Sequence, residues 1–215
     1  MAQVTWESFH NSIDTGLPND SDRAAEMATI RAAIADRSAF APLYRRYARP
    51  VFGYCLRRLA DRDRAADATS QTFIRALTAL PGFSPDPDNP GATFRAWLFT
   101  IAHNVVTDMH RRNRHHASLD APDRDGNADA THLLDPGRSP EAQAIARDEA
   151  RQLRAMLAVL PDRQRRIVEL RLADLTGAEI AETLGMTASA VKSAQFRAYS
   201  TLRDRFPDLH TGRSS

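Results

Sequence analysis

The 215-residue sequence has 42% hydrophobic and 26% charged residues and a formal net charge of +2, which is typical of a soluble globular protein. It begins with no basic region followed by an apolar run, and no segment is long and apolar enough to span a bilayer. We therefore expect a cytoplasmic protein with no membrane insertion. Cys55 is the single cysteine, so neither an intrachain disulfide nor a cysteine-based zinc cluster is expected. Its apolar neighbours at helical spacing predict a packed thiol.

Helical periodicity dominates the first half of the chain. Residues 1–20 lack it and are expected to form a mobile N-terminal extension. The first helix is predicted to start at a cap on Ser21 or Asp22 and the second at a cap on Ser38, with Pro50 kinking or splitting the second. Four helices with short connections predict a compact bundle over residues 21–116. Their expected ranges are 22–35, 38–59, 61–80 and 94–112.

The helix that follows Thr93 has two different faces. Leu98, Ala102 and Val105 belong to an apolar stripe, whereas the opposite stripe carries hydroxyl, amide and guanidinium groups and leads to a basic end. Such a helix suits nucleic acid, although an ordinary amphipathic helix with a solvated face has the same pattern. The candidate nucleic-acid contacts on or beside it are Thr93, Phe94, Arg95, Thr100, Asn104, Thr107, Asp108, Arg111, Arg112 and Arg114.

Residues 117–138 separate two helical regions. This segment is rich in Asp, Gly, Pro and Ala and has little to bury, so it is predicted to be a flexible linker. The linker and the start of the next helix are acidic: from residue 120 to 150 there are eight acidic residues and three arginines. A second domain is expected over 139–207, followed by a tail over 208–215. Its predicted helices cover 140–159, 161–173, 176–184 and 187–205.

The last two of these helices have the sequence features of a helix-turn-helix. Thr176 and Glu179 form a capping box, and Gly185 stands where a left-handed residue ends a helix. Val191, Ala198 and Leu202 are predicted to be buried, while small and basic residues point outward to suit a major groove. A plain helical hairpin is the alternative. The candidate DNA contacts are Thr187, Ser189, Lys192, Ser193, Phe196 and Arg197.

The helix predicted over 61–80 also has an unusual outer face. Small residues such as Ala68 and Thr72 share one side, whereas the other side carries Ile74 surrounded by short polar groups. That composition is typical of a protein-docking patch, although single exposed apolar residues are common. The candidate docking residues are Asp67, Ser70, Gln71 and Ile74.

The order of these segments resembles a bacterial RNA polymerase sigma factor of the extracytoplasmic-function (ECF) type. The motif Phe40-x-x-Leu43-Tyr44-x-x-Tyr47 is similar to the opening helix of conserved region 2. Residues 65–76 resemble its polymerase-binding helix, and residues 94–104 resemble its promoter-melting segment. Residues 160–166 and the helix-turn-helix resemble region 4, and the short linker replaces the region 3 of housekeeping sigma factors. The resemblance covers residues 35–205 apart from the linker.

The resemblance implies an all-α fold of two small helical domains and a function in promoter recognition. Region 2, over residues 21–116, would bind the clamp helices of the largest subunit of core RNA polymerase through the docking residues. It would also read and open the −10 element around Asn104. Region 4, over 139–207, would place its recognition helix in the −35 major groove and contact the flap of the second subunit. An anti-sigma factor held between the domains is a further candidate partner, and the protein would be nucleoid-associated when active.

Two other function classes compete with this hypothesis. A stand-alone helix-turn-helix regulator would also bind DNA, but the alternating strands of a receiver domain are absent from the predicted N-terminal half. An enzyme would need a catalytic constellation. His103 and His110 are seven residues apart, but no acidic or cysteine ligands share their spacing, and no phosphate-cradling glycine loop is present. We therefore expect no enzyme activity, no cofactor and no metal site, with the histidines near phosphates or exposed.

Overall fold

The computed structural model describes residues 20–86, 88–117 and 140–206. Every regular element in these ranges is helical, as predicted. The first group contains α2 (Asp20–Ala35), a 3-10 turn (Arg37–Phe40), α3 (Ala41–Leu59), α4 (Arg62–Ala79) and α5 (Phe94–Ala117). The second contains α6 (Pro140–Ala158), α7 (Asp162–Arg171), α8 (Gly177–Leu184) and α9 (Ala188–Arg205). The expected N-terminal extension, linker and tail lie outside the described residues, except for their boundary positions 20 and 117.

Most helix starts follow local capping chemistry. The Asp61 carboxylate accepts a hydrogen bond from the backbone NH of Arg64 at 2.8 Å, and the Thr93 hydroxyl accepts one from Ala96 at 3.1 Å. The predicted cap on Ser38 is wrong, because the Asp36 carboxylate accepts from the Ser38 NH and thereby caps the 3-10 turn ahead of α3. The first helix already includes Asp20, so the proposed caps on the next two residues are wrong as well.

Pro50 lies inside α3 without dividing it, so the predicted split does not occur. The helix ends at Leu59, and the next residue, Ala60, caps it in the left-handed conformation (φ 55°) with its NH bonded to the carbonyl of Leu56. Small residues bring α4 close to its neighbours. The hydroxyls of Thr69 and Thr72 on its buried face each donate to a carbonyl one turn back, which satisfies them without an outside partner.

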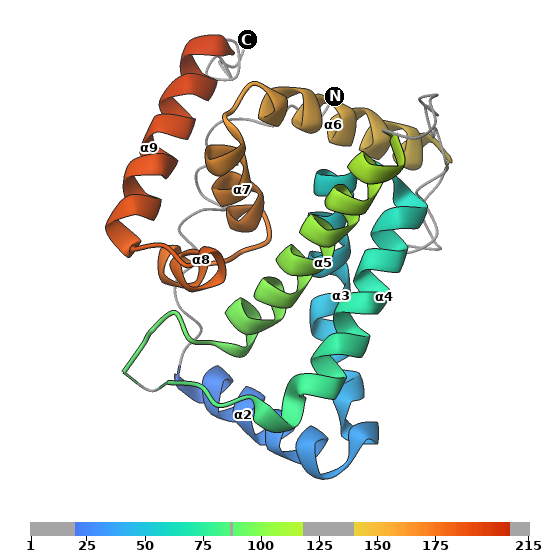
Figure 1. Ribbon diagram of the computed structural model, residues 1–215, viewed down its shortest axis with the longest axis vertical. Coiled ribbons are helices and arrows are strands. Elements are labelled where there is room, and N and C mark those ends of the chain that lie inside the picture. Colours follow the sequence, from blue (N-terminus) through green and yellow to red (C-terminus); the bar gives the residue numbers. More distant parts are fainter. Residues whose placement is uncertain (1–19, 87, 118–139, 207–215) are drawn as a thin grey trace.

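The two helical groups pack against one another rather than standing apart. In Figure 1, α5 lies between α3 and α4 on one side and α7 and α8 on the other. One hydrophobic cluster joins residues of both groups, with Phe94 and Leu98 from α5 and Leu175 and Ile180 from the α8 region. A smaller cluster inside the second group includes Leu160 and lies among α6, α7 and α9. No helix of the described residues is long and apolar enough to cross a membrane.

Candidate nucleic-acid interface

The recognition face of α9 is formed by local sequence signals. The Thr176 hydroxyl and the Glu179 carboxylate bond to each other's backbone NH groups, so the predicted capping box is present at the start of α8. Gly185 has φ 60° and closes α8 in the left-handed conformation, after which the Thr187 side chain caps α9. These two signals set the turn between the helices, and they hold α9 with one side against α8.

The two sides of α9 divide as the pattern predicted. Val191, Ala198 and Leu202 are buried. Gln195, at the edge of this stripe, donates a hydrogen bond to the Tyr199 hydroxyl at 3.0 Å, which meets the need for a partner. The other side is solvent-facing and carries a cation beside small hydroxyl residues and a 74% exposed aromatic ring. The exposed residues of this recognition face are Thr187, Ser189, Lys192, Ser193, Phe196 and Arg197.

The α5 helix presents the expected polar stripe to solvent. Asn104, Thr107, Arg111 and Arg112 are exposed. The hydroxyl of Thr100, at the start of the stripe, is bound to the carbonyl one turn back and is half-buried. The apolar stripe on the other side is buried or half-buried, so the predicted two-faced helix is confirmed.

Two candidates near the basic end of α5, Asp108 and Arg114, differ from the rest of the stripe. Asp108 is engaged within the fold, where its carboxylate pairs with Arg75 of α4 at 3.6 Å and with Arg111 at 3.7 Å. It therefore links two helices and orients a neighbouring cation. The side chain of Arg114 lies outside the described residues, although its backbone is in α5.

The ring of Phe94 is a core residue in this structure, which corrects the expectation that it is exposed for strand contact. It is 2% exposed. Its ring centroid lies 5.6 Å from those of Tyr47 and Phe83 and 5.5 Å from that of Trp97. These tilted and edge-on contacts anchor the start of α5 in the bundle. An aromatic residue beside a second aromatic fits a core or a stacking platform equally well, so the sequence pattern could not separate the two.

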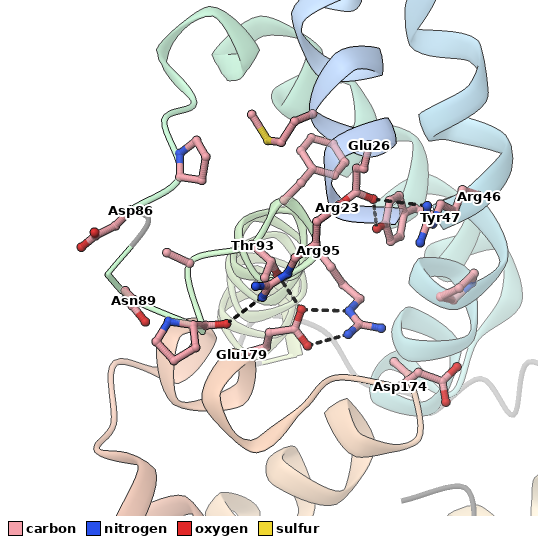
Figure 2. Close-up of a pocket in the computed structure, with 17 residues that line it drawn as sticks. Arg23, Glu26, Arg46, Tyr47, Asp86, Asn89, Thr93, Arg95, Asp174 and Glu179 are labelled. Atoms are coloured by element: carbon pink, nitrogen blue, oxygen red, sulfur yellow. Dashed lines mark hydrogen bonds and ion pairs between the residues drawn. The ribbon is translucent and has the colours of Figure 1, made fainter. Parts of the chain in front are cut away.

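Thr93 and Arg95 flank this ring and turn toward α8, where both contact Glu179 (Figure 2). The Thr93 hydroxyl donates to one carboxylate oxygen at 2.6 Å. Arg95 donates from Nε to the same oxygen at 3.1 Å and from Nη2 to the other at 2.7 Å. Glu179 is 1% exposed. Burial alone would raise its pKa, but Arg95 and the Thr93 hydroxyl outweigh burial and hold the pKa below its usual value. We call this group the α5–α8 junction.

A second set of polar contacts joins α3 to α7. Arg57 donates to the backbone carbonyl of Glu169 at 3.1 Å, and Arg58 donates to its carboxylate at 3.2 Å. Burial raises the pKa of Glu169 although the two arginines oppose that shift. Next to this set, the His103 ring nitrogen Nδ1 lies 2.9 Å from the Tyr54 hydroxyl. The expectation that this histidine lies near phosphates or in solvent is wrong, because it is half-buried and its ring nitrogen is engaged with Tyr54.

The docking candidates occupy one side of α4. Asp67 and Ser70 are exposed, Ile74 is 66% exposed, and Gln71 is half-buried beside them. The predicted inner residues of the same helix, including Ala68 and Thr72, are buried. An apolar side chain therefore projects from a ring of short polar groups on the exposed side of α4.

A cavity of about 380 Å³ opens beside the junction (Figure 2). Several of its polar lining groups are paired: the Tyr47 hydroxyl donates to Glu26 at 2.5 Å, Arg46 lies 3.7 Å from the same carboxylate, and Arg23 donates to the Pro90 carbonyl at 3.4 Å. Within the described residues, no group of three or more His, Cys, Asp or Glu side chains is arranged to hold a metal ion.

Comparison with known proteins assigns the two helical groups to known families. Residues 43–116 match Sigma-70 region 2, and residues 150–202 match Sigma-70 region 4. The chain is 33% identical over 191 residues to the ECF RNA polymerase sigma factor BldN of Streptomyces coelicolor, covering 88% of this chain and 69% of BldN. It is 32% identical over 186 residues to SigD of Mycobacterium tuberculosis (strain H37Rv), covering 82% of each. The chain belongs to the ECF RNA polymerase sigma factors. It therefore directs promoter-specific transcription initiation by core RNA polymerase and is not a stand-alone regulator.

A solved structure shares the fold of this sigma factor. The structure of CnrH in complex with the cytosolic domain of CnrY superposes with a TM-score of 0.61 at 22% identity, covering 84% of this chain and 96% of CnrH.

The sequence reasoning missed two buried acids at the contacts between the helical groups of this sigma factor. Glu169 interrupts the apolar run 167–170, and an acid among core residues is a signal that a cationic partner is near. Glu179 had no such signal, because the capping box already accounts for a glutamate at this position and requires no partner on another helix.

Proposed function

We propose that this sigma factor divides promoter recognition between two exposed faces. The recognition face of α9 enters the major groove of the −35 element, and the polar stripe of α5 meets the opened strand of the −10 element. The corresponding functional units are residues 139–207 and 21–116. The observation that carries this proposal is the alignment of six candidate residues on the solvent-facing side of α9, above a fully buried stripe.

The chemistry of the α9 face suits a groove. Small side chains such as Ser189 and Ser193 allow close approach, and their hydroxyls can bond to base edges or phosphates. Lys192 and Arg197 supply charge for phosphate oxygens. Phe196 supplies an apolar surface for contact with a sugar or a thymine methyl group.

The α5 stripe supports a role in holding an opened strand. Unstacking a base costs roughly a few kcal/mol, and contacts to the separated strand offset that cost. Asn104 has both donor and acceptor atoms for a base, and Thr107 adds a hydroxyl on the next turn. Arg111, Arg112 and Arg114 would hold backbone phosphates at the end of the helix. Asp108 would act through Arg111, whose guanidinium it orients.

The α4 strip of Asp67, Ser70, Gln71 and Ile74 is our candidate for the contact with the clamp helices of the polymerase. An exposed apolar side chain within a polar ring supports this role, because interface centres combine an apolar anchor with a polar rim. The second helical group would contact the flap. An anti-sigma factor is a further proposed partner, motivated by the shared fold with CnrH. A cytoplasmic location, at the nucleoid during transcription, follows from this function.

Run-off transcription tests the proposal directly. Purified protein and core polymerase are incubated with fragmented genomic DNA, and the start sites are mapped. We expect discrete start sites that share two upstream elements, and weak binding of the protein alone to the same duplexes. Lys192→Ala should reduce transcription and lower the salt dependence of binding by about one phosphate contact. Tight, specific duplex binding without polymerase, together with transcription unchanged by Lys192→Ala, would contradict the assignment of the −35 contact to α9.

A further inference from the structure

The closed arrangement of the two helical groups conflicts with simultaneous contact to both promoter elements. By their names, the −10 and −35 elements lie about 25 base pairs apart, which is roughly 85 Å of duplex at 3.4 Å per base pair. The Thr183 hydroxyl of α8 donates to the Ala96 carbonyl of α5 at 3.2 Å, so the groups are in direct contact.

Helix lengths limit how far apart the two DNA-binding faces can be in this state. At 1.5 Å per residue, α8 and α9 together measure about 40 Å, and Asn104 lies about 12 Å along α5 from Ala96. The separation therefore falls short of the roughly 85 Å that the two elements require. The 22 residues from 118 to 139 can span at most about 75 Å, so the covalent connection permits the groups to separate.

The junction also covers two of the candidate nucleic-acid contacts at the start of α5. Thr93 and Arg95 are predicted nucleic-acid contacts, yet all their donors described above point at Glu179 (Figure 2). A carboxylate held by a hydroxyl and a guanidinium fork has the charge and geometry of a nucleic-acid phosphate in the same place. Glu179 cannot leave these donors while α8 stays on α5.

We propose that the α5–α8 junction is a self-inhibitory contact, in which Glu179 occupies the donors of Thr93 and Arg95 and so makes closure and strand binding mutually exclusive. This inference rests on the proposed role of α5 in strand contact. Polymerase binding, which needs the two groups apart, and DNA, which needs the same donors, both shift the molecule toward the open state. The strand contact of Thr93 and Arg95 is thereby withheld until polymerase engages the free protein.

Two substitutions open the junction by unrelated means. Glu179→Gln removes the charge but keeps the capping box, since glutamine serves at that position as well as glutamate. Gly91→Ala works sterically: an added Cβ at Gly91 would lie 2.4 Å from the backbone oxygen of Ala178 and 2.8 Å from its carbonyl carbon, so the loop and α8 must move apart. Asp204→Asn is the matched control, because it changes net charge by the same amount at an exposed site whose carboxylate pairs with its neighbour Arg203.

Solution scattering and single-strand binding measure the two halves of the proposal. The probe for binding is a fluorescent oligothymidylate of about 20 nucleotides, because contacts of Thr93 and Arg95 with backbone phosphates do not depend on base sequence. If the closed form makes up about 90% of the free protein, opening it tightens the apparent affinity about tenfold. We expect both opening variants to show a larger radius of gyration and tighter binding, and Asp204→Asn to match the wild type. Adding Arg95→Ala to Glu179→Gln should remove the gain in binding.

An unchanged radius of gyration in both opening variants would overturn the proposal, and so would expansion without tighter binding to the oligothymidylate. Failure of the proposed function looks different: the wild-type protein would give no run-off product with core polymerase, whatever the scattering and the oligonucleotide binding show.

Discussion

Replacing Phe94 with alanine tests whether this ring holds the fold or contacts the opened strand. The side chain is 2% exposed and packs on three other aromatic rings. Deleting a buried phenylalanine costs about 3–5 kcal/mol, and aromatic pairs contribute about 0.5–1.5 kcal/mol each beyond the buried area. We therefore expect Phe94→Ala to lose about 4 kcal/mol of unfolding free energy, which is a large part of the roughly 5–15 kcal/mol of a typical domain.

The assay is urea unfolding followed by far-ultraviolet circular dichroism. With a slope of about 2–3 kcal/mol per molar urea, the expected loss lowers the midpoint by roughly 1–2 M. Phe196→Ala is the matched control, because it removes the same ring from a site that is 74% exposed and should stay within about 0.5 kcal/mol of the wild type. If Phe94→Ala were as stable as the control and still failed to form open complexes, the ring would act on DNA and the packing argument would be wrong.

Three further predictions concern the exposed faces and the half-buried His103. Asp67→Arg should weaken pull-down of core polymerase roughly tenfold, the loss expected for one central interface contact. Asp63→Arg, at an exposed position in the first turn of the same helix, should leave the pull-down unchanged. Equal effects of the two variants would place the docking surface elsewhere. Asn104→Ala should reduce heparin-resistant open complexes roughly tenfold without changing the pull-down, and a parallel loss in both assays would contradict its role in strand opening. His103→Gln should flatten the dependence of stability on pH. Burial, followed by neighbouring arginines, lowers the pKa of His103 from 6.5 to about 4. The folded protein therefore binds this proton less readily than the unfolded chain. The contribution of neutral His103 to the free energy of unfolding is complete above about pH 6.5 and is lost as the pH falls toward about 4. The slope is up to about 1.4 kcal/mol per pH unit. Urea unfolding midpoints across this pH range measure the difference between His103→Gln and the wild type. Equal pH profiles for the two proteins would refute the assignment of this pH dependence to His103.

Local signals were enough to predict the helices and the orientation of their faces. The capping box at Thr176 and the glycine at the end of α8 act within one turn, so the residues alone determine them. The alternation of buried and exposed residues in α4, α5 and α9 follows from helical periodicity, and it was predicted for the same reason. The surfaces assigned to polymerase and DNA depended in addition on the order of the segments along the chain.

The contact between the two groups could not be predicted in this way. The apolar side chain of Ile180 fits the core of the helix-turn-helix as well as the hydrophobic cluster that it shares with α5. Arg95 carries a charge that pairs as readily with a carboxylate as with a phosphate, so its residue type does not identify its partner. Long-range pairing of this kind depends on where two distant surfaces meet, which periodicity does not encode.

The burial of Cys55 has a consequence for how this protein can be regulated. The thiol is fully covered, and burial raises its pKa to about 12, so only about one molecule in 10⁴–10⁵ carries a thiolate at neutral pH. Oxidants and alkylating agents act on thiolates, and these 215 residues contain no second cysteine with which to form a disulfide. The single cysteine of this sigma factor is thus poorly placed to sense oxidants, and a thiol-based redox signal would have to reach its promoters through another molecule.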